Sequence, residues 1–197
     1  MPELAEVEFY RKQWSPGIGQ KVRKVRLHPK ARIFRDVDPK HLTEDLPGAR
    51  FDESMAHGKQ MCFRFSGNRF LGIHLGMTGK LLAADIEMVP DRHDHLVLTM
   101  DSVALVFSDY RMFGKVRFKG QVIADADSGR KGQVVVPAWW RDLPPPPQDP
   151  AFDKARLREI LKRRGRKPLK ALLLDQDAFP GIGNWMADEI LWRARIH

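Results

Sequence analysis

The start of the chain places a proline and three glutamates close together, in the stretch PELAEVE that follows Met1. A proline and acidic residues are both typical of the first turn of a helix, and taken alone the stretch favours that interpretation. Loss of Met1 would instead leave Pro2 as a secondary amine beside the Glu3 carboxylate. Such a pair could supply a nucleophile and a proton-transfer group.

A second stretch, LLLDQDAFPGIGNWMADEIL, predicts a phosphate site. A tight turn with Gly181 and Gly183 precedes a helix that begins at Asn184, whose first backbone N–H groups and side-chain amide would be free to bind an anion. An ordinary helix hairpin is the alternative. The basic run RRGRK, which ends at Lys167, favours phosphate binding and places Lys167 among the residues expected to contact a phosphate, which would be that of DNA if the family resemblance given below holds.

The elements that must position these residues fall into two kinds. Apolar residues at helical spacing predict a helix over residues 3–14, and Pro16-Gly17 ends it. Short strand-like runs follow, separated by Gly, Asn, Asp or Ser, which predicts an antiparallel sandwich or barrel. These runs are KVRKVRL, MCFRF, RFLGIHL, HLVLTM, VALVF and KVRF, with hairpin turns at SGN and MDS.

Beyond a run of four prolines the pattern becomes helical, with helices in DKARLREILKRRG, KPLKALLLDQ and NWMADEILWRARIH. The sequence therefore predicts an α+β protein: a β-sandwich domain with a flanking helix over 1–136, a Pro-rich linker over 137–151, and a helical domain over 152–197, to which the family resemblance described below assigns DNA binding. A basic cleft between the domains would hold Pro2, Glu3 and Lys59 on one side and Asn184 on the other.

The charge balance points to a polyanionic partner. The chain of 197 residues has 34 Lys and Arg against 25 Asp and Glu, a net charge of +9, which suits nucleic acid or an anionic membrane surface. No apolar run is long enough to span a bilayer, and no signal peptide is visible. Cys62 is the only cysteine, so this chain has no disulfide framework and no cysteine zinc site, and a cytoplasmic setting is expected.

Several motifs in order resemble one family. PELAEVE, HLGMTGKL, DRHDHL, SDYRMFG and FPGIGNWMADEILWRARIH are similar to blocks of the formamidopyrimidine-DNA glycosylase and endonuclease VIII family. The resemblance covers nearly the whole chain. It implies a monomeric bifunctional DNA glycosylase and abasic-site lyase with a helix–two-turns–helix module, acting in base-excision repair on double-stranded DNA with damaged bases.

For the chemistry, the resemblance implies a Schiff base at Pro2 and β,δ-elimination, with Glu3 as the proton-transfer group. An α-amino group titrates near ~8, well below a lysine at about 10.4, so it is the more available nucleophile. Glu6 would be structural. Lys59, in HGKQM, would pair with a phosphate near the lesion.

For DNA binding, the resemblance implies that Met77, Arg111 and Phe113 fill the gap left by the extruded base, with Arg111 on the orphaned opposite base. The alternative is that Met77 and Phe113 belong to the core. His74, His93 and His95 only superficially resemble a metal cluster, and hydrogen-bonding or DNA-backbone roles are expected for them.

The chain departs from the family pattern in three places. Ala5 replaces a proline, and Tyr110 and Met112 replace a proline and an arginine of DPRRFG, so that one phosphate contact would be lost. The sequence also stops where the family continues into a zinc or zincless finger, so no cofactor is expected from this chain. Oxidised purines are favoured as substrates. Oxidised pyrimidines, or a non-catalytic nucleic-acid-binding module, are the alternatives.

Overall fold

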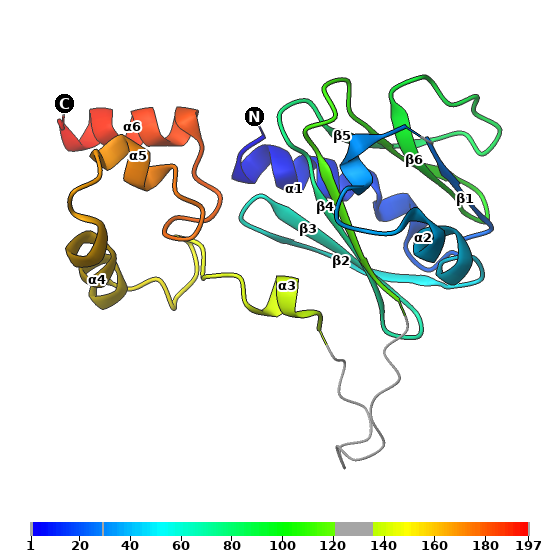
Figure 1. Ribbon diagram of the computed structural model, residues 1–197, viewed down its shortest axis with the longest axis horizontal. Coiled ribbons are helices and arrows are strands. Elements are labelled where there is room, and N and C mark those ends of the chain that lie inside the picture. The colour runs from blue at the N-terminus through cyan, green and yellow to red at the C-terminus, as the bar shows by residue number, and fades with distance from the viewer. Residues whose placement is uncertain (1, 29, 121–135, 197) are drawn as a thin grey trace, which may run out of the picture.

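Two antiparallel sheets face one another in the N-terminal part of the chain (Figure 1). The computed structural model describes residues 2–28, 30–120 and 136–196. One sheet has the strand order β1-β6-β7-β5, and the other has the order β2-β3-β4-β8. The α+β class and the β-sandwich predicted from the sequence are therefore confirmed. The strands are β1 Lys24–Leu27, β2 Phe51–His57, β3 Gln60–Phe65, β4 Arg69–His74, β5 Lys80–Ala84, β6 Asp94–Thr99, β7 Ala104–Ser108 and β8 Lys115–Lys119.

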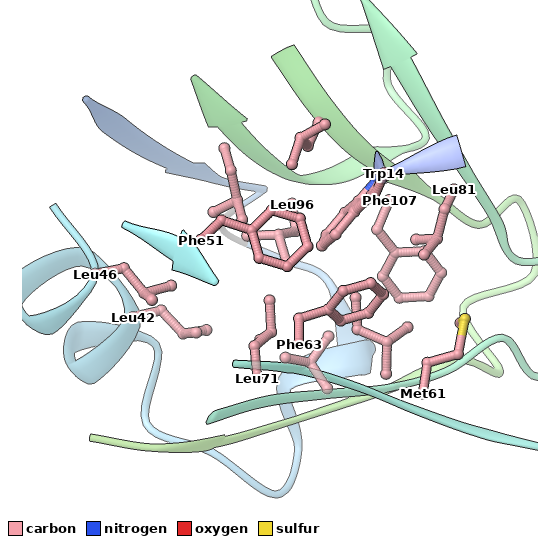
Figure 2. Packing of buried hydrophobic residues seen from close by; sticks show 14 of the residues in the cluster. Trp14, Leu42, Leu46, Phe51, Met61, Phe63, Leu71, Leu81, Leu96 and Phe107 are labelled. Carbon is pink, nitrogen blue, oxygen red and sulfur yellow. The ribbon is translucent and has the colours of Figure 1, made fainter. Parts of the chain in front are cut away.

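Large apolar side chains from both sheets meet between them (Figure 2). Trp14, Phe51, Phe63 and Phe107 are fully buried in this layer. Burial of each such side chain stabilises the fold by roughly 1.5–3 kcal/mol. The indole N–H of Trp14 donates to the Val106 carbonyl oxygen at 3.2 Å, so its one polar atom is satisfied within the core.

The N-terminal helix α1 (Leu4–Gln13) lies at the edge of the sandwich, where it contacts β5 and β2. Short helices complete this part of the chain: η1 Ser15–Gly17, η2 Arg32–Phe34 and α2 Pro39–Asp45. The sequence analysis missed α2, β2 and β5. Helix α2 buries only Leu42 and so shows little apolar periodicity, while a register shift between Phe51 and Glu53 interrupts the alternation of β2.

The C-terminal helices form a second body with its own core, beside the N-terminal end of α1 (Figure 1). They are α4 Lys154–Arg164, α5 Leu169–Leu173 and α6 Asn184–Ala194, as the sequence predicted. Their buried residues are Leu172, Leu173, Ala178, Phe179, Ile182 and Ala187.

The predicted linker contains a short helix, α3 Ala138–Arg141. Trp139 of this helix packs on the outer face of β4, where a Cβ atom at Gly72 would lie 2.7 Å from the Trp139 ring. His57 contacts the same segment, since its Nε2 donates to the Pro144 carbonyl oxygen at 2.7 Å. The segment is thus attached to the sandwich, although the predicted domain boundaries stay predictions.

Candidate active site

Glu3 joins the start of α1 to the start of α6. Its Oε1 accepts a hydrogen bond from the Trp185 backbone N–H at 2.9 Å, and its Oε2 accepts one from Met186 at 3.0 Å. The N-terminus of α6 therefore holds an anion, but the anion is the chain's own carboxylate. The prediction of free N–H groups at this helix start, available to a phosphate, is wrong for these two amides.

Close backbone approach makes this contact possible. A Cβ atom at Gly183 would lie 2.3 Å from Glu3 Oε1, and one at Gly181 would lie 2.3 Å from a Leu4 methyl group. Gly181 also has φ +95°, which favours glycine. The two glycines that the sequence analysis assigned to an anion site thus form the notch that receives the start of α1.

Lys59 reaches the same turn from the β2–β3 hairpin. Its side chain is only 5% exposed, and its Nζ donates to the Ile182 carbonyl oxygen at 2.8 Å. Burial lowers the pKa of Lys59, while the Glu3 carboxylate acts in the opposite direction. Lys59 is therefore a buried contact between the two bodies rather than a solvated surface lysine.

Pro2 is buried directly ahead of α1, and Asn184 is exposed at the start of α6. Asn184 lines a pocket that also includes Glu3 and Glu6. The charged residues of this pocket are acidic, whereas the sequence analysis predicted a basic cleft. We call Pro2, Glu3, Lys59 and the turn over residues 180–186 the interdomain site. Met1 lies outside the described residues.

Glu6 has a structural contact, in line with the role expected for it. Its Oε2 accepts a hydrogen bond from the Glu3 backbone N–H at 3.0 Å, which caps the start of α1. This bond fixes the backbone that carries the Glu3 carboxylate toward α6.

Met77, Arg111 and Phe113 come together at the surface of the sandwich, and we call them the gap-filling site after the role that the resemblance implies for them. Met77 is 45% exposed and Phe113 is 49% exposed, so neither belongs to the core. The Arg111 guanidinium carbon lies 4.5 Å from the centroid of the Phe113 ring, and Arg111 Nη1 lies 3.5 Å from the Met77 sulfur. Two segments separated in sequence thus present one mixed apolar and cationic cluster.

His74 lies between the two sites. Its Nδ1 accepts a hydrogen bond from the Gly76 N–H at 3.0 Å, at the start of the turn that carries Met77. Burial, followed by the nearby charges of Lys59, Arg117 and Arg35, lowers the pKa of His74 to about 4. The imidazole is therefore neutral in a positively charged surrounding.

The two substituted positions beside Arg111 have different surroundings. The ring of Tyr110, which is 68% exposed, lies 4.9 Å from the His93 ring in an edge-on arrangement. Met112 has φ +54° and packs against the main core. Where the family pattern has an arginine, this chain therefore has an apolar side chain that anchors the loop.

Lys167 is paired within the helical body. Its Nζ lies 2.9 Å from Asp175 Oδ2, which also contacts Arg164. The hydrogen bonds from Lys167 and Arg164 hold the pKa of Asp175 below its usual value. This ion pair does not test the DNA contact that the sequence analysis assigned to Lys167.

Three residues that contact the sites were missed by the sequence analysis: Gln176, Thr78 and Asp109. Gln176 holds the interdomain turn, because its Nε2 donates to the Ile182 carbonyl oxygen and its Oε1 accepts from Gly181. A lone amide inside a turn gives no periodic signal. Only its place in the GIG turn region could have drawn attention to it.

Metal ligands and membrane spans were also sought in the described part of the chain. Residues 2–28, 30–120 and 136–196 include no group of three or more His, Cys, Asp or Glu side chains able to hold a metal. Within the same ranges, no helix has the length and apolar character to cross a membrane.

A sandwich joined through its first helix to a helix–two-turns–helix module defines a class of DNA-processing proteins, and comparisons identify the family. Residues 1–116 match the model of the formamidopyrimidine-DNA glycosylase N-terminal domain, and residues 143–197 match that of the formamidopyrimidine-DNA glycosylase H2TH domain. The chain therefore belongs to the formamidopyrimidine-DNA glycosylase family.

Relatives and solved structures agree with this assignment. The chain is 37% identical to formamidopyrimidine-DNA glycosylases of Symbiobacterium thermophilum and Mycobacterium avium, matching over its full length and over 61% and 68% of theirs. A Lactococcus lactis formamidopyrimidine-DNA glycosylase bound to DNA containing an AP site is 28% identical, with a TM-score of 0.82, over 100% of this chain and 71% of that one. MutM in complex with DNA containing carbocyclic 8-oxo-G gives a TM-score of 0.82 at 29% identity, over 100% of this chain and 69% of that one.

Proposed function

We propose that this chain carries the chemistry of a base-excision repair enzyme: a DNA glycosylase for oxidised purines that also cleaves the resulting abasic site. The observation that supports this most is the interdomain site. Glu3, covalently next to Pro2, is fixed by two amides of α6, and Lys59 is buried at the same turn. A binding module would not need an N-terminal amine, a carboxylate and a buried lysine around one point.

The reaction would begin at the Pro2 nitrogen once Met1 is removed, because an intact Met1 makes that nitrogen an amide without a nucleophilic lone pair. The amine attacks C1′ of the damaged nucleotide, the new N–C1′ bond replaces the bond to the base, and the base leaves with a proton. Opening of the sugar gives an iminium, which withdraws electrons and promotes loss of the 3′ phosphate and then the 5′ phosphate.

Glu3 would move the protons of these steps. General acid–base catalysis of this kind contributes about 10²–10⁴-fold. Its two hydrogen bonds to α6 fix the carboxylate beside the amine before substrate arrives. Fixed groups of this kind need no reorganisation during the reaction.

Lys59 would contact the phosphodiester near the lesion. An ammonium group has three N–H donors, and the Ile182 carbonyl takes one of them, which leaves donors for a phosphate oxygen. The lowered pKa of Lys59 reflects burial, and a phosphate would supply the negative charge that favours its protonated form. Asn184, exposed at the edge of the pocket, would add an amide donor.

The gap-filling site would occupy the space left by the extruded nucleotide. Phe113 and Met77 supply exposed apolar surface for wedging, and Arg111 supplies the hydrogen-bond donors for the orphaned base. The similarity to MutM bound to DNA containing carbocyclic 8-oxo-G supports an oxidised purine in double-stranded DNA as the substrate.

Borohydride trapping tests this function. Protein with a confirmed Pro2 N-terminus is incubated with duplexes containing 8-oxoguanine, formamidopyrimidine, thymine glycol or an abasic site, and the adduct is mapped by peptide mass. We expect a crosslink at Pro2 with the purine lesions and the abasic site. A crosslink at a lysine would overturn the Pro2 assignment. Preference for thymine glycol would favour the pyrimidine alternative, and binding without any adduct would favour the non-catalytic module.

A further inference from the structure

Asp109 is a fully buried carboxylate directly after β7, ahead of the segment that carries Arg111 and Phe113. None of the ion pairs found among the described residues involves it. Its Oδ2 accepts a hydrogen bond from the Gly114 N–H at 2.7 Å, and its Oδ1 accepts one from the Thr78 hydroxyl at 2.5 Å. A buried acidic side chain held only by neutral donors is uncommon, and the donors show what it organises.

The donors belong to the two segments that form the gap-filling site. Thr78 follows Met77, and Gly114 follows Phe113. The Arg111 backbone N–H is shared between Thr78 Oγ1 at 3.2 Å and Asp109 Oδ1 at 3.3 Å. One carboxylate and one hydroxyl thus fix the backbone next to each of the three gap-filling side chains, while those side chains stay exposed.

Close packing leaves little room for another arrangement. A Cβ atom at Gly114 would lie 2.9 Å from Asp109 Oδ2, and one at Gly76 would lie 2.5 Å from the Gly114 nitrogen. The Asp109 backbone is fixed as well. Its carbonyl oxygen accepts from His95 Nε2 at 2.8 Å, and its N–H donates to the His93 carbonyl oxygen at 3.0 Å.

We propose that Asp109 and Thr78 are positioning residues that set the geometry of Met77, Arg111 and Phe113 for insertion into lesion-containing DNA. The proposal rests on the proposed function, because it assigns these two residues to the same gap-filling step. Their contribution is indirect: they hold the backbone of both segments in the DNA-free protein, so that binding does not have to order it.

The first experiment needs no DNA. Thr78→Val keeps the shape of the side chain but removes the hydroxyl, which leaves Asp109 Oδ1 with only its long contact to Arg111. We expect amide hydrogen exchange at Arg111 and Gly114 to become about tenfold faster, as for loss of one hydrogen bond to a charged acceptor. Thr78→Ser should restore slow exchange. Asp109→Asn, which offers one acceptor oxygen instead of two, should also accelerate it.

A matched control lies at the opposite end of the same hairpin. Asp101 also accepts a backbone N–H, from Lys21 at 2.8 Å, but it lies in the turn between β6 and β7, whereas Asp109 follows the other end of β7. Asp101→Asn should leave exchange at Arg111 and Gly114 unchanged. Unchanged exchange in Thr78→Val would overturn the proposal without bearing on the proposed enzyme chemistry.

The second experiment is a double-mutant cycle on a duplex with a tetrahydrofuran abasic-site analogue. Thr78→Val should weaken binding about tenfold in the parent, but less than about twofold in a background with Arg111→Ala and Phe113→Ala, because the positioned groups are then absent. An equal factor in both backgrounds would show a merely structural role and overturn the proposal. If the parent protein forms no borohydride-trapped adduct at Pro2, the proposed function is overturned instead.

Discussion

The interdomain site and the gap-filling site differ in how their functional side chains are exposed and fixed. At the interdomain site the functional side chains are enclosed. Lys59 is 5% exposed, and both carboxylate oxygens of Glu3 accept hydrogen bonds from backbone N–H groups of α6. At the gap-filling site the side chains are free, with Met77 45% and Phe113 49% exposed, and only the backbone behind them is fixed. The side chains assigned to bond-making are fixed by hydrogen bonds of their own polar atoms. The side chains assigned to DNA insertion are positioned only through hydrogen bonds of the adjacent backbone.

This difference predicts how substitutions act. Changes at the interdomain site should alter chemistry and the docking of the two bodies together, because the same hydrogen bonds serve both. Changes to the exposed gap-filling side chains should alter DNA binding with stability nearly constant, since exposed substitutions usually change stability by less than about 0.5 kcal/mol.

Glu3→Gln should have the largest effect. The amide has one acceptor oxygen, so it can keep only one of the two bonds to α6, and it is no longer an acid. We expect base removal to slow by about 10²–10⁴-fold, measured in single-turnover assays on 8-oxoguanine duplexes. Trapping at a preformed abasic site should be less affected. Glu8→Gln is the control on the same helix, because the Glu8 carboxylate pairs with Arg11 of α1, and an equal loss there would contradict the assignment.

Lys59→Met should have the second-largest effect. The substitution keeps the buried stem but removes the cation, so the salt dependence of DNA binding should change. The slope of log affinity against log salt should fall by about one unit, with the ranking of lesions unchanged. Lys24→Met, at an exposed position on β1, should leave the slope as it is. A slope equal to the parent's would show that Lys59 makes no phosphate contact.

Phe113→Ala should cost less and should separate binding from stability. Removal of one aromatic wedge is expected to weaken affinity for an abasic duplex by roughly 1–2 kcal/mol, as for loss of a stacking contact with a base. Chemical unfolding should give nearly the same midpoint as the parent. A large drop in the midpoint would mean that Phe113 belongs to the core after all.

The smallest expected effect concerns pH and lies between the two sites. The folded protein keeps His74 neutral down to a pKa of about 4, whereas an unfolded histidine titrates near 6.5. The unfolded state therefore binds more protons between these pH values, and the free energy of unfolding falls as pH falls through that window.

His74→Asn should flatten this dependence. The amide oxygen can accept from Gly76 in place of Nδ1, but the side chain does not titrate. We expect the stability difference between pH 7 and pH 4 to shrink by about 1 kcal/mol, a value discounted for the partial exposure of the ring. Urea unfolding across this range measures it, and parallel curves for parent and variant would argue against a neutral buried His74.

The two sites were also unequally predictable from the sequence. Periodicity marks most of the strands and helices, and the ordered family motifs single out Met77, Arg111 and Phe113, which the structure brings together at the surface. The Glu3 bond to α6 spans 182 residues, and no local pattern encodes a contact of that range. The same holds for Lys59, whose charge suggests a surface position until its burial under Ile182 is seen.

The residues that fix the backbone of the gap-filling site were missed for a related reason. Asp109 and Thr78 look like ordinary polar loop residues, and their importance comes from burial and from shared backbone donors. The missed strand β2 carries a register shift that disturbs its alternation. Periodicity in the sequence thus identifies helices and strands. Hydrogen bonds that follow no sequence period determine the positions of the functional side chains.

The bond between Glu3 and α6 also has a consequence in time. During synthesis the carboxylate has no partner until Trp185 and Met186 have left the ribosome, 182 and 183 residues later. At roughly 5–20 residues per second, that interval is about 10 to 40 s. Throughout it the Glu3 carboxylate lacks its partner on α6 and the residues ahead of α1 are open to an aminopeptidase, and the finished fold then encloses Pro2. The emergence of α6 therefore ends the period in which the amine can be uncovered.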